Sequence, residues 1–360
     1  MDPRVVFRTH YQVDEPAYLE LLTKICTSPV QSSYREIAAQ KLAREIGRRR
    51  KKSFNEDAAA YAVDLGKDLE VLNENQTWTD KGHLVSLIAD TPDIEWEKQL
   101  LLSPSERLLH FRLFLEGDGA ALIFLSQRLL EMGVLDNSET GWNSLASEMF
   151  SEIFSNYLAI TNNTQDRVGL RRKVQQQETK YAGHSGSHKL FIHLQTLYRL
   201  GLIERPTPNG ARVYKLPTRL LHTKLGLDIL VEELKGVFHL EQVIRSQNWI
   251  EVAAKVFQVE YLYADEDALD LSMLVSFYER VTATGTPLCS ISTLINAAQI
   301  QLLSHNSRLL PFETAIRALQ NIQKANPKSV RFHVDRRGQP AFLKLSNEFV
   351  TNFSGNKVLA

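Results

Sequence analysis

Three histidines within ten residues are the first group in this sequence that could do chemistry. They occur in HSGSHKLFIH as His184, His188 and His193, and imidazole is the commonest metal ligand in proteins. Positions i, i+4 and i+9 do not share one helix face, and no cysteine or carboxylate nearby completes a zinc ligand set. We therefore interpret these histidines as surface or groove-facing side chains and expect no metal.

Two acidic stretches have the residue types of metal-dependent sites. PDIEWEKQ, at 92–99, carries the carboxylates and lysine of a metal nuclease, which holds such groups together on strands, but here the pattern is typical of a loop that enters a helix. YADEDALDL, at 263–271, lacks the glycine turn of a calcium loop and has the pattern of a solvated helix start.

Sequence motifs of the common enzyme classes are missing. There is no Walker phosphate loop, no Rossmann glycine fingerprint, no HExxH and no GxSxG. We therefore predict a protein that is not an enzyme and has no cofactor. A metal nuclease that uses Glu95 and Glu97 stays open as an alternative.

The composition is that of a globular protein of two or three domains. The chain has 360 residues, of which 43% are hydrophobic and 23% charged. No apolar run reaches about 18 residues, so we expect no membrane span, and MDPRVVFRTHYQVDEP has no pattern of a secretory signal. Cys26 and Cys289 are too few for a disulfide framework, which favours a cytoplasmic location.

The elements that must position any functional site are mostly predicted to be helices. Apolar residues recur at three- and four-residue spacing in 16–27, 34–49, 55–72, 105–133, 141–160, 187–201, 290–304 and 311–325. Within 105–133, Gly117-Asp118-Gly119 predicts a break between two helices. Alternating residues predict hairpins at 203–216, where Asn209-Gly210 favours a tight turn, and at 329–345, with a weaker one near 74–79. The fold class is therefore mainly α with small β-hairpins.

The net charge of zero is a cancellation between segments of opposite sign. Residues 31–55, 167–224 and 286–360 carry net charges of +6, +10 and +6, whereas 56–166 and 225–285 carry −14 and −7. Chance clustering of solvated helix faces is one explanation. The two basic segments that end in a clear hairpin favour another, an anionic partner such as nucleic acid.

Three segments resemble winged helix-turn-helix domains. LYRLGLIERPTPNGARVYKL is similar to the end of a recognition helix followed by a two-stranded wing, AVDLGKDLEVLNENQTWTDKGHLV to a version with a truncated wing, and AIRALQNIQKANPKSVRFHVDRRGQPAFLKL to a third copy. The resemblance implies several winged-helix modules joined by helical segments. It also implies a double-stranded DNA partner, with one helix in the major groove and the wing along the backbone.

The resemblance divides the chain into five parts. They are an N-terminal winged-helix-like module at 1–90, an acidic helical segment at 91–166, a central basic winged-helix module at 167–224, a second acidic helical segment at 225–285 and a C-terminal winged-helix-like module at 286–360.

DNA contacts follow from the same resemblance, and we expect those of the central module on one basic face. Its recognition helix offers Ser187, His188, Lys189, Gln195, Thr196 and Arg199, its wing offers Arg205, Asn209, Arg212 and Lys215, and Arg171, Arg172 and Lys173 lie upstream. The C-terminal module adds Arg317, Asn321 and Lys324 on its helix and Arg331, His333, Arg336, Arg337 and Lys344 on its wing. Plain solvated hairpins are the alternative explanation for these basic residues.

The N-terminal module departs from the pattern because its candidate recognition helix, at 55–72, is acidic. Asp57, Asp64, Asp68 and Glu70 lie on that helix, and phosphate repels such groups. Two hypotheses therefore stand. The chain is a DNA-binding subunit or regulator of a larger DNA-processing assembly, or it is a scaffold whose winged helices and acidic segments bind partner proteins.

Overall fold

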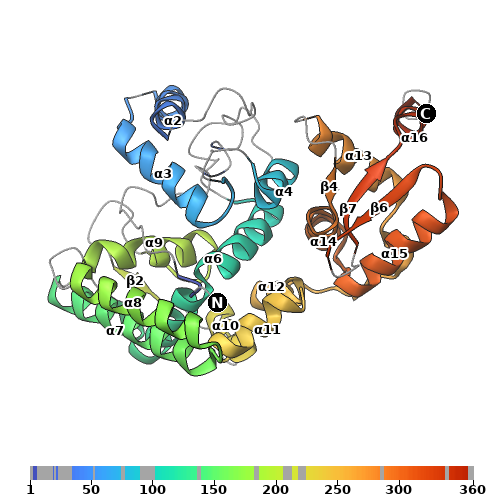
Figure 1. The fold of residues 1–360 in the computed structure, drawn as a ribbon. Coiled ribbons are helices and arrows are strands. Elements are labelled where there is room, and N and C mark those ends of the chain that lie inside the picture. Colours follow the sequence, from blue (N-terminus) through green and yellow to red (C-terminus); the bar gives the residue numbers. More distant parts are fainter. Residues whose placement is uncertain are drawn as a thin grey trace.

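The fold is known from a computed structural model that describes residues 3–5, 19, 22, 35–51, 53–73, 78–89, 102–135, 139–181, 186–205, 213–217, 224–283, 288–336 and 340–355. The chain is mainly helical with a few short strands (Figure 1). The predicted fold class is confirmed at this level.

Helix α6 (Pro104–Met132) packs against elements from the N-terminal, central and C-terminal parts of the chain. It begins with a capping box, in which the amide of Glu106 donates to Oγ of Ser103 and the amide of Ser103 donates to the Glu106 carboxylate. The predicted break at Gly117-Asp118-Gly119 is wrong, because α6 is continuous. A Cβ on Gly117 would lie 2.5 Å from Cδ2 of Leu69, and one on Gly119 would lie 2.9 Å from Cδ1 of Leu240. These glycines allow close packing rather than a helix end.

The N-terminal unit consists of α2 (Arg35–Arg50), α3 (Glu56–Asp68) and α4 (Asp80–Ile88). Asn55 caps α3 by accepting from the amide of Asp57 at 2.7 Å. An antiparallel bridge between Leu72 and Trp78 precedes α4. The weaker predicted hairpin is therefore present as this single bridge, and residues 74–77 lie outside the described residues.

Replacing Gly82 of α4 with alanine is expected to lower the free energy of unfolding by about 1–3 kcal/mol. Its Cβ would lie 2.4 Å from the carbonyl oxygen of Val71, a backbone atom that cannot rotate away. Gly169→Ala on α8 (Thr164–Tyr181) is the matched control, because nothing described lies within 4 Å of that Cβ. It should stabilise the protein by about 0.5–1 kcal/mol through helix propensity. Urea unfolding measures both variants, and equal stability would contradict the close contact.

The central unit places its strands at one end and a polar helix at the other. Helices α7 (Glu139–Ile160) and α6 flank α9 (Gly186–Arg199), whose predicted stripe of Leu190, Phe191, Leu194 and Leu197 is buried. Strand β1 (Val134–Leu135) pairs antiparallel with β2 (Tyr214–Lys215). Glu204 exchanges both backbone hydrogen bonds with Lys215 at 2.9 and 3.0 Å, so Lys215 lies between Glu204 and Val134. The turn of this predicted hairpin, 206–212, lies outside the described residues.

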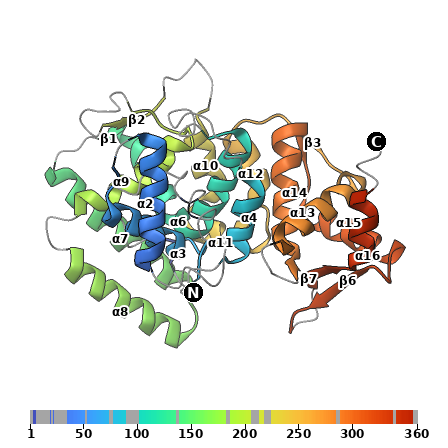
Figure 2. The same ribbon diagram turned by 90° about the horizontal axis from the view of Figure 1, so that it is seen from above.

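The C-terminal unit forms one end of the molecule in both views (Figures 1 and 2). It consists of α13 (Leu271–Thr282), β4 (Cys289–Ser290), α14 (Ile291–Asn306), β5 (Arg308–Leu309), α15 (Phe312–Ala325), β6 (Val330–Val334), β7 (Pro340–Leu345) and α16 (Asn347–Gly355). Its antiparallel sheet has the strand order β4-β7-β6. The hairpin predicted at 329–345 is confirmed as β6 and β7.

Three further helices link the C-terminal unit to α6. Helices α10 (Gly226–Leu234), α11 (Val237–Arg245) and α12 (Trp249–Val256) pack against α6. Strand β3 (Leu262–Tyr263) then pairs parallel with β5, and the short 3₁₀-helix η1 (Glu266–Ala268) leads into α13.

The core is continuous across these units. Buried apolar residues from α2 to β7 form one cluster, so the predicted modules share a core rather than standing apart. Strand β1 pairs with β2 across the boundary that we predicted after residue 166. Among the described residues, no helix is both long and apolar enough to cross a bilayer.

Candidate functional site

The outer face of the hairpin β6–β7 carries a row of basic and aromatic side chains. Arg331 lies directly opposite Lys344, and His333 lies opposite Phe342. All four side chains are exposed, whereas Val330, Leu343 and Leu345 on the other face are buried. Strand alternation explains the division, because successive side chains point to opposite faces of a sheet.

No carboxylate among the described residues forms an ion pair with Arg331 or Lys344. Two cations directly opposite each other on neighbouring strands repel and destabilise the pair. Arg336, just beyond β6, is also exposed, and Arg337 lies outside the described residues. The hairpin therefore presents positive charge that the described part of the protein does not neutralise.

Helix α15 presents a polar face beside this hairpin. Arg317, Asn321 and Lys324 are exposed on it, and Ala315, Ala318 and Leu319 face the core, as predicted. Two of the three exposed side chains already have a protein partner, because the Glu266 carboxylate accepts from Arg317 at 2.8 Å and from Asn321 at 2.6 Å.

The predicted DNA contacts of helix α9 are partly wrong. Gln195 is 1% exposed and accepts a hydrogen bond from the Tyr214 hydroxyl at 3.0 Å, and Thr196 is also buried. Helix α9 lies between neighbours on more than one side, so its polar residues become buried hydrogen-bonding groups rather than a groove-facing surface. Arg199 is half-buried, with its guanidinium 5.3 Å from the Tyr198 ring.

The described basic residues near the central strands contact other side chains of the protein. The Arg205 guanidinium is half-buried and lies 5.8 Å from the ring of Phe191 and 5.9 Å from that of Tyr214. Lys215 forms an ion pair with Glu204 at 3.3 Å. Asn209 and Arg212 lie outside the described residues, as do the side chains of Lys173, His188 and Lys189.

The described basic residues of the central module do not lie on the single face that we expected. Arg171 and Arg172 are exposed on α8, whereas Lys215 belongs to β2. Figure 2 shows α8 and β2 at opposite ends of a stack in which α9 and α7 lie between them. Basic residues that are close in the sequence are therefore distributed over different sides of this unit.

The histidine interpretation also needs correction for His193. Its Nδ1 lies 2.5 Å from Oδ2 of Asp118, and both side chains are fully buried between α9 and α6. His193 is thus part of a buried polar pair rather than a surface group. Among the described residues, no group of three or more His, Cys, Asp or Glu side chains could hold a metal ion.

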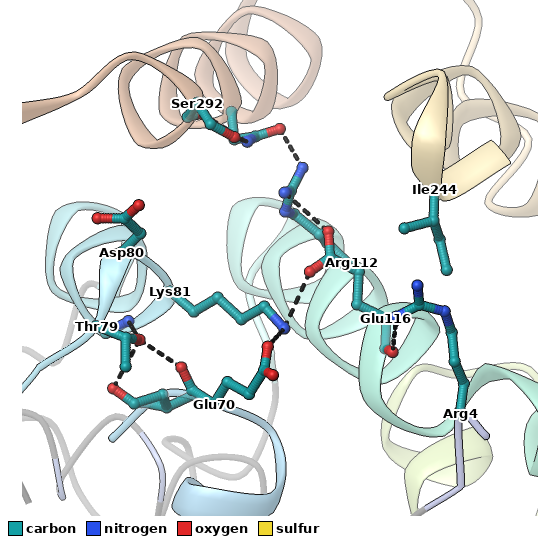
Figure 3. Close-up of polar contacts among 12 residues, drawn as sticks. Arg4, Glu70, Thr79, Asp80, Lys81, Arg112, Glu116, Ile244 and Ser292 are labelled. Atoms are coloured by element: carbon teal, nitrogen blue, oxygen red, sulfur yellow. Dashed lines mark hydrogen bonds and ion pairs between the residues drawn. The ribbon is translucent and has the colours of Figure 1, made fainter. Parts of the chain in front are cut away.

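A charged cavity lies where α4, α6, α11 and α14 meet (Figure 3). It has a volume of about 320 Å³ and contains the side chains of Arg4, Lys81, Arg112 and Glu116. The Glu116 carboxylate lies 2.8 Å from Nη2 of Arg112 and 3.1 Å from Nζ of Lys81. Its backbone carbonyl accepts from Arg4 at 2.7 Å.

Each cation of this cavity already has an anionic partner. Lys81 also binds Glu70 at 2.7 Å, and Arg4 binds Glu241 at 2.7 Å. Burial by itself would raise the pKa of Glu116, but Arg112 and Lys81, with Arg4, outweigh burial and hold that pKa below its ordinary value. The arrangement therefore joins four segments by ion pairs rather than offering free charge to an anionic ligand.

A cysteine and two glutamates are the remaining side chains that bear on possible catalysis. Burial raises the pKa of Cys289 to about 12, so its thiol stays protonated and is a poor nucleophile at neutral pH. Glu95 and Glu97, the candidate nuclease residues, lie outside the described residues, and that alternative stays a hypothesis.

Sequence reasoning missed the cavity because its members come from distant segments. A local signal for it is the i, i+4 spacing of Arg112 and Glu116 within a helix rich in apolar residues. Comparison of the chain with protein-family models, with curated proteins and with solved structures found no match.

Proposed function

We propose that this chain binds double-stranded DNA through the outer face of the hairpin β6–β7, as a subunit or regulator of a larger DNA-processing assembly, and that it catalyses no reaction. The observation that carries the proposal is the pair of opposed cations Arg331 and Lys344, with which no carboxylate among the described residues forms an ion pair. Phosphates are the natural counter-charge for such a pair, and they would relieve its repulsion.

The connectivity of residues 271–345 supports a winged-helix assignment for this unit. Its elements follow the order α13, β4, α14, β5, α15 and hairpin β6–β7, and β4 lies next to β7 in the sheet. Strand β5 pairs outside this sheet, with β3. In such a unit α15 is the recognition helix and β6–β7 is the wing. A wing that contacts phosphates contributes affinity with little sequence preference.

The central unit has a related strand order but a different role in our proposal. Lys215 lies between Glu204 and Val134, as in a three-stranded wing that follows α9. Arg199 and Arg205 are half-buried beside aromatic rings and Lys215 is ion-paired, so we assign the unit a structural role. Arg167, Arg171 and Arg172 on α8 are exposed.

Replacing both Arg331 and Lys344 with alanine is expected to weaken duplex binding about tenfold at low salt, because two charge-assisted phosphate contacts are lost. The loss should be similar for unrelated duplex sequences. The log–log dependence of affinity on salt should become shallower by about 1.8, at about 0.9 per phosphate. A fluorescence-anisotropy titration of the full chain with a labelled duplex over a salt series measures both.

The matched control removes the same charge from the other exposed basic surface. Arg171→Ala with Arg172→Ala on α8 should leave affinity within about twofold, as expected for residues outside the interface. A loss confined to the α8 variant would move the contact to that helix. No duplex binding by the unmodified chain at low salt would overturn the proposal.

A protein scaffold is the second candidate function. It is favoured by the settings of Arg205, Lys215 and Gln195, which contact the protein's own side chains. Absence of duplex binding, with the fold intact by circular dichroism, is the result that would favour it.

A further inference from the structure

The carboxylate of Glu266 binds two exposed polar side chains of helix α15. Oε1 of Glu266 accepts from Nε of Arg317 at 2.8 Å, and Oε2 accepts from Nδ2 of Asn321 at 2.6 Å. Arg317 and Asn321 are one helical turn apart, so the two oxygens of Glu266 bridge successive turns. The neighbouring Asp265 accepts from Nη2 of Arg308 at 3.2 Å. Acidic side chains thus bind Arg308 on β5 and two polar side chains along the exposed face of α15.

The backbone around Glu266 is fixed at both sides. The amide of Ala264 donates to the carbonyl of Leu309 at 2.8 Å, and the amide of Leu262 donates to that of Ser307 at 3.0 Å. On the other side, Ala268 and Leu269 are buried. The Glu266 carboxylate is therefore held close to α15, and it can leave Arg317 and Asn321 by side-chain rotation alone.

Glu266 binds the two side chains, Arg317 and Asn321, with which a recognition helix at this position would contact DNA bases. Arginine makes bidentate contacts to guanine and asparagine to adenine, and a guanidinium also binds phosphate in the fork that a carboxylate uses. We propose that Glu266 is an intramolecular competitor of DNA at α15, and that it lowers both the affinity and the sequence discrimination of the free protein. This inference rests on the proposed function, with the wing making the first contact.

The competition is weak enough for DNA to overcome. Arg317 and Glu266 are both partly exposed, with 57% and 36% of their side chains accessible. Solvent screening keeps such surface pairs weak. Glu266 therefore tunes binding rather than preventing it, and no movement of the backbone is needed.

The test compares two variants that remove the same charge from the same region. Glu266→Gln should bind a random-sequence duplex about threefold more tightly than the unmodified chain, the size expected from release of one surface ion pair. Its salt dependence should steepen by about 0.9 as Arg317 gains a phosphate. Glu313→Gln, on the exposed first turn of α15, controls for general electrostatics. Equal gains in both variants would overturn the proposal.

A double-mutant cycle assigns the gain to Arg317. Arg317→Ala should change the affinity of the unmodified chain by less than about twofold, because Arg317 is already occupied, but should abolish the gain of Glu266→Gln. An equal loss in both backgrounds would show that Arg317 contacts DNA despite Glu266, and would overturn the inference.

The outcomes separate this inference from the proposed function. If the unmodified chain binds duplex through Arg331 and Lys344 but Glu266→Gln has no effect, the inference alone fails. If neither the unmodified chain nor Glu266→Gln binds duplex at low salt, both fail.

Discussion

Replacing Glu116 with alanine is expected to lower the free energy of unfolding by about 3–5 kcal/mol, the range for breaking a buried ion pair by removing one partner. Arg112 is 5% exposed, and without Glu116 its charge would be buried beside two neutral groups, the Asn296 amide and the Trp249 ring. Alanine is a better helix former than glutamate, so a change in helix propensity cannot account for the loss of stability. Chemical denaturation followed by circular dichroism measures the change.

The control for this prediction is an exposed pair of the same chemistry. Glu232 accepts from Lys224 at 2.7 Å on α10, and both side chains are more than half exposed. Glu232→Ala should therefore cost less than about 1 kcal/mol. Equal effects at Glu116 and Glu232 would show that the cavity does not depend on its ion pairs.

The same carboxylate gives the stability a defined pH dependence. The pKa of Glu116 is lowered in the folded protein from an ordinary value of 4.5, so the folded state favours the ionised form. This contribution is fully present above about pH 4.5 and is lost as pH falls through the lowered pKa. The unmodified chain should consequently lose stability below pH 4.5 more steeply than Glu116→Gln, as measured by urea unfolding at several pH values.

Replacing Asp118 with alanine is the second large expected effect, about 3 kcal/mol of lost stability. His193 Nδ1 would lose its hydrogen-bond partner in a fully buried site between α6 and α9, and an unsatisfied buried polar group is costly. Asp118→Asn keeps an amide oxygen that can accept from Nδ1–H, so it should cost less than about 1 kcal/mol if the histidine is neutral. Thermal unfolding of the two variants measures the difference.

The Asp118→Asn variant tests whether the buried pair needs a charged carboxylate beside an imidazolium or works with a neutral histidine. A loss in Asp118→Asn as large as in Asp118→Ala would show that the carboxylate charge, and hence an imidazolium, is needed. No loss in Asp118→Ala would contradict the structural role of the pair. A further variant, Asp118→Ala with His193→Leu, should recover part of the loss because neither partner is then left unsatisfied.

Local patterns in the sequence were sufficient for much of the secondary structure. The apolar spacing that predicts helices at 34–49, 187–201 and 311–325 corresponds to α2, α9 and α15, and alternation at 329–345 corresponds to β6 and β7. These patterns depend on 3.6- and 2-residue periods, which neighbouring residues define among themselves. The two-residue period of a strand also predicts that Arg331 and His333 share one face of the hairpin. The structure places them there together with Lys344.

Long-range packing decided the features that were predicted wrongly or missed. Gly117 and Gly119 have the composition of a helix break, but close approach of Leu69 and Leu240 makes them contact points in a continuous helix. Gln195 has the polarity of a surface residue and became buried because Tyr214, nineteen positions later, covers it. The two-residue strand β1 has no periodicity of its own and is defined by its pairing with β2.

The sequence by itself determined a mainly helical chain with a basic hairpin near its carboxyl end. Only the tertiary structure decided which charges stay available to a partner. Arg112, Arg317 and Lys215 all carry the same kind of charge, yet Glu116, Glu266 and Glu204 neutralise them. Arg331 and Lys344, by contrast, lie opposite each other and pair with no carboxylate in the part of the chain that the structure describes. Coulombic pairing depends on distances of a few ångströms between residues that can be far apart in the chain, and only folding sets those distances.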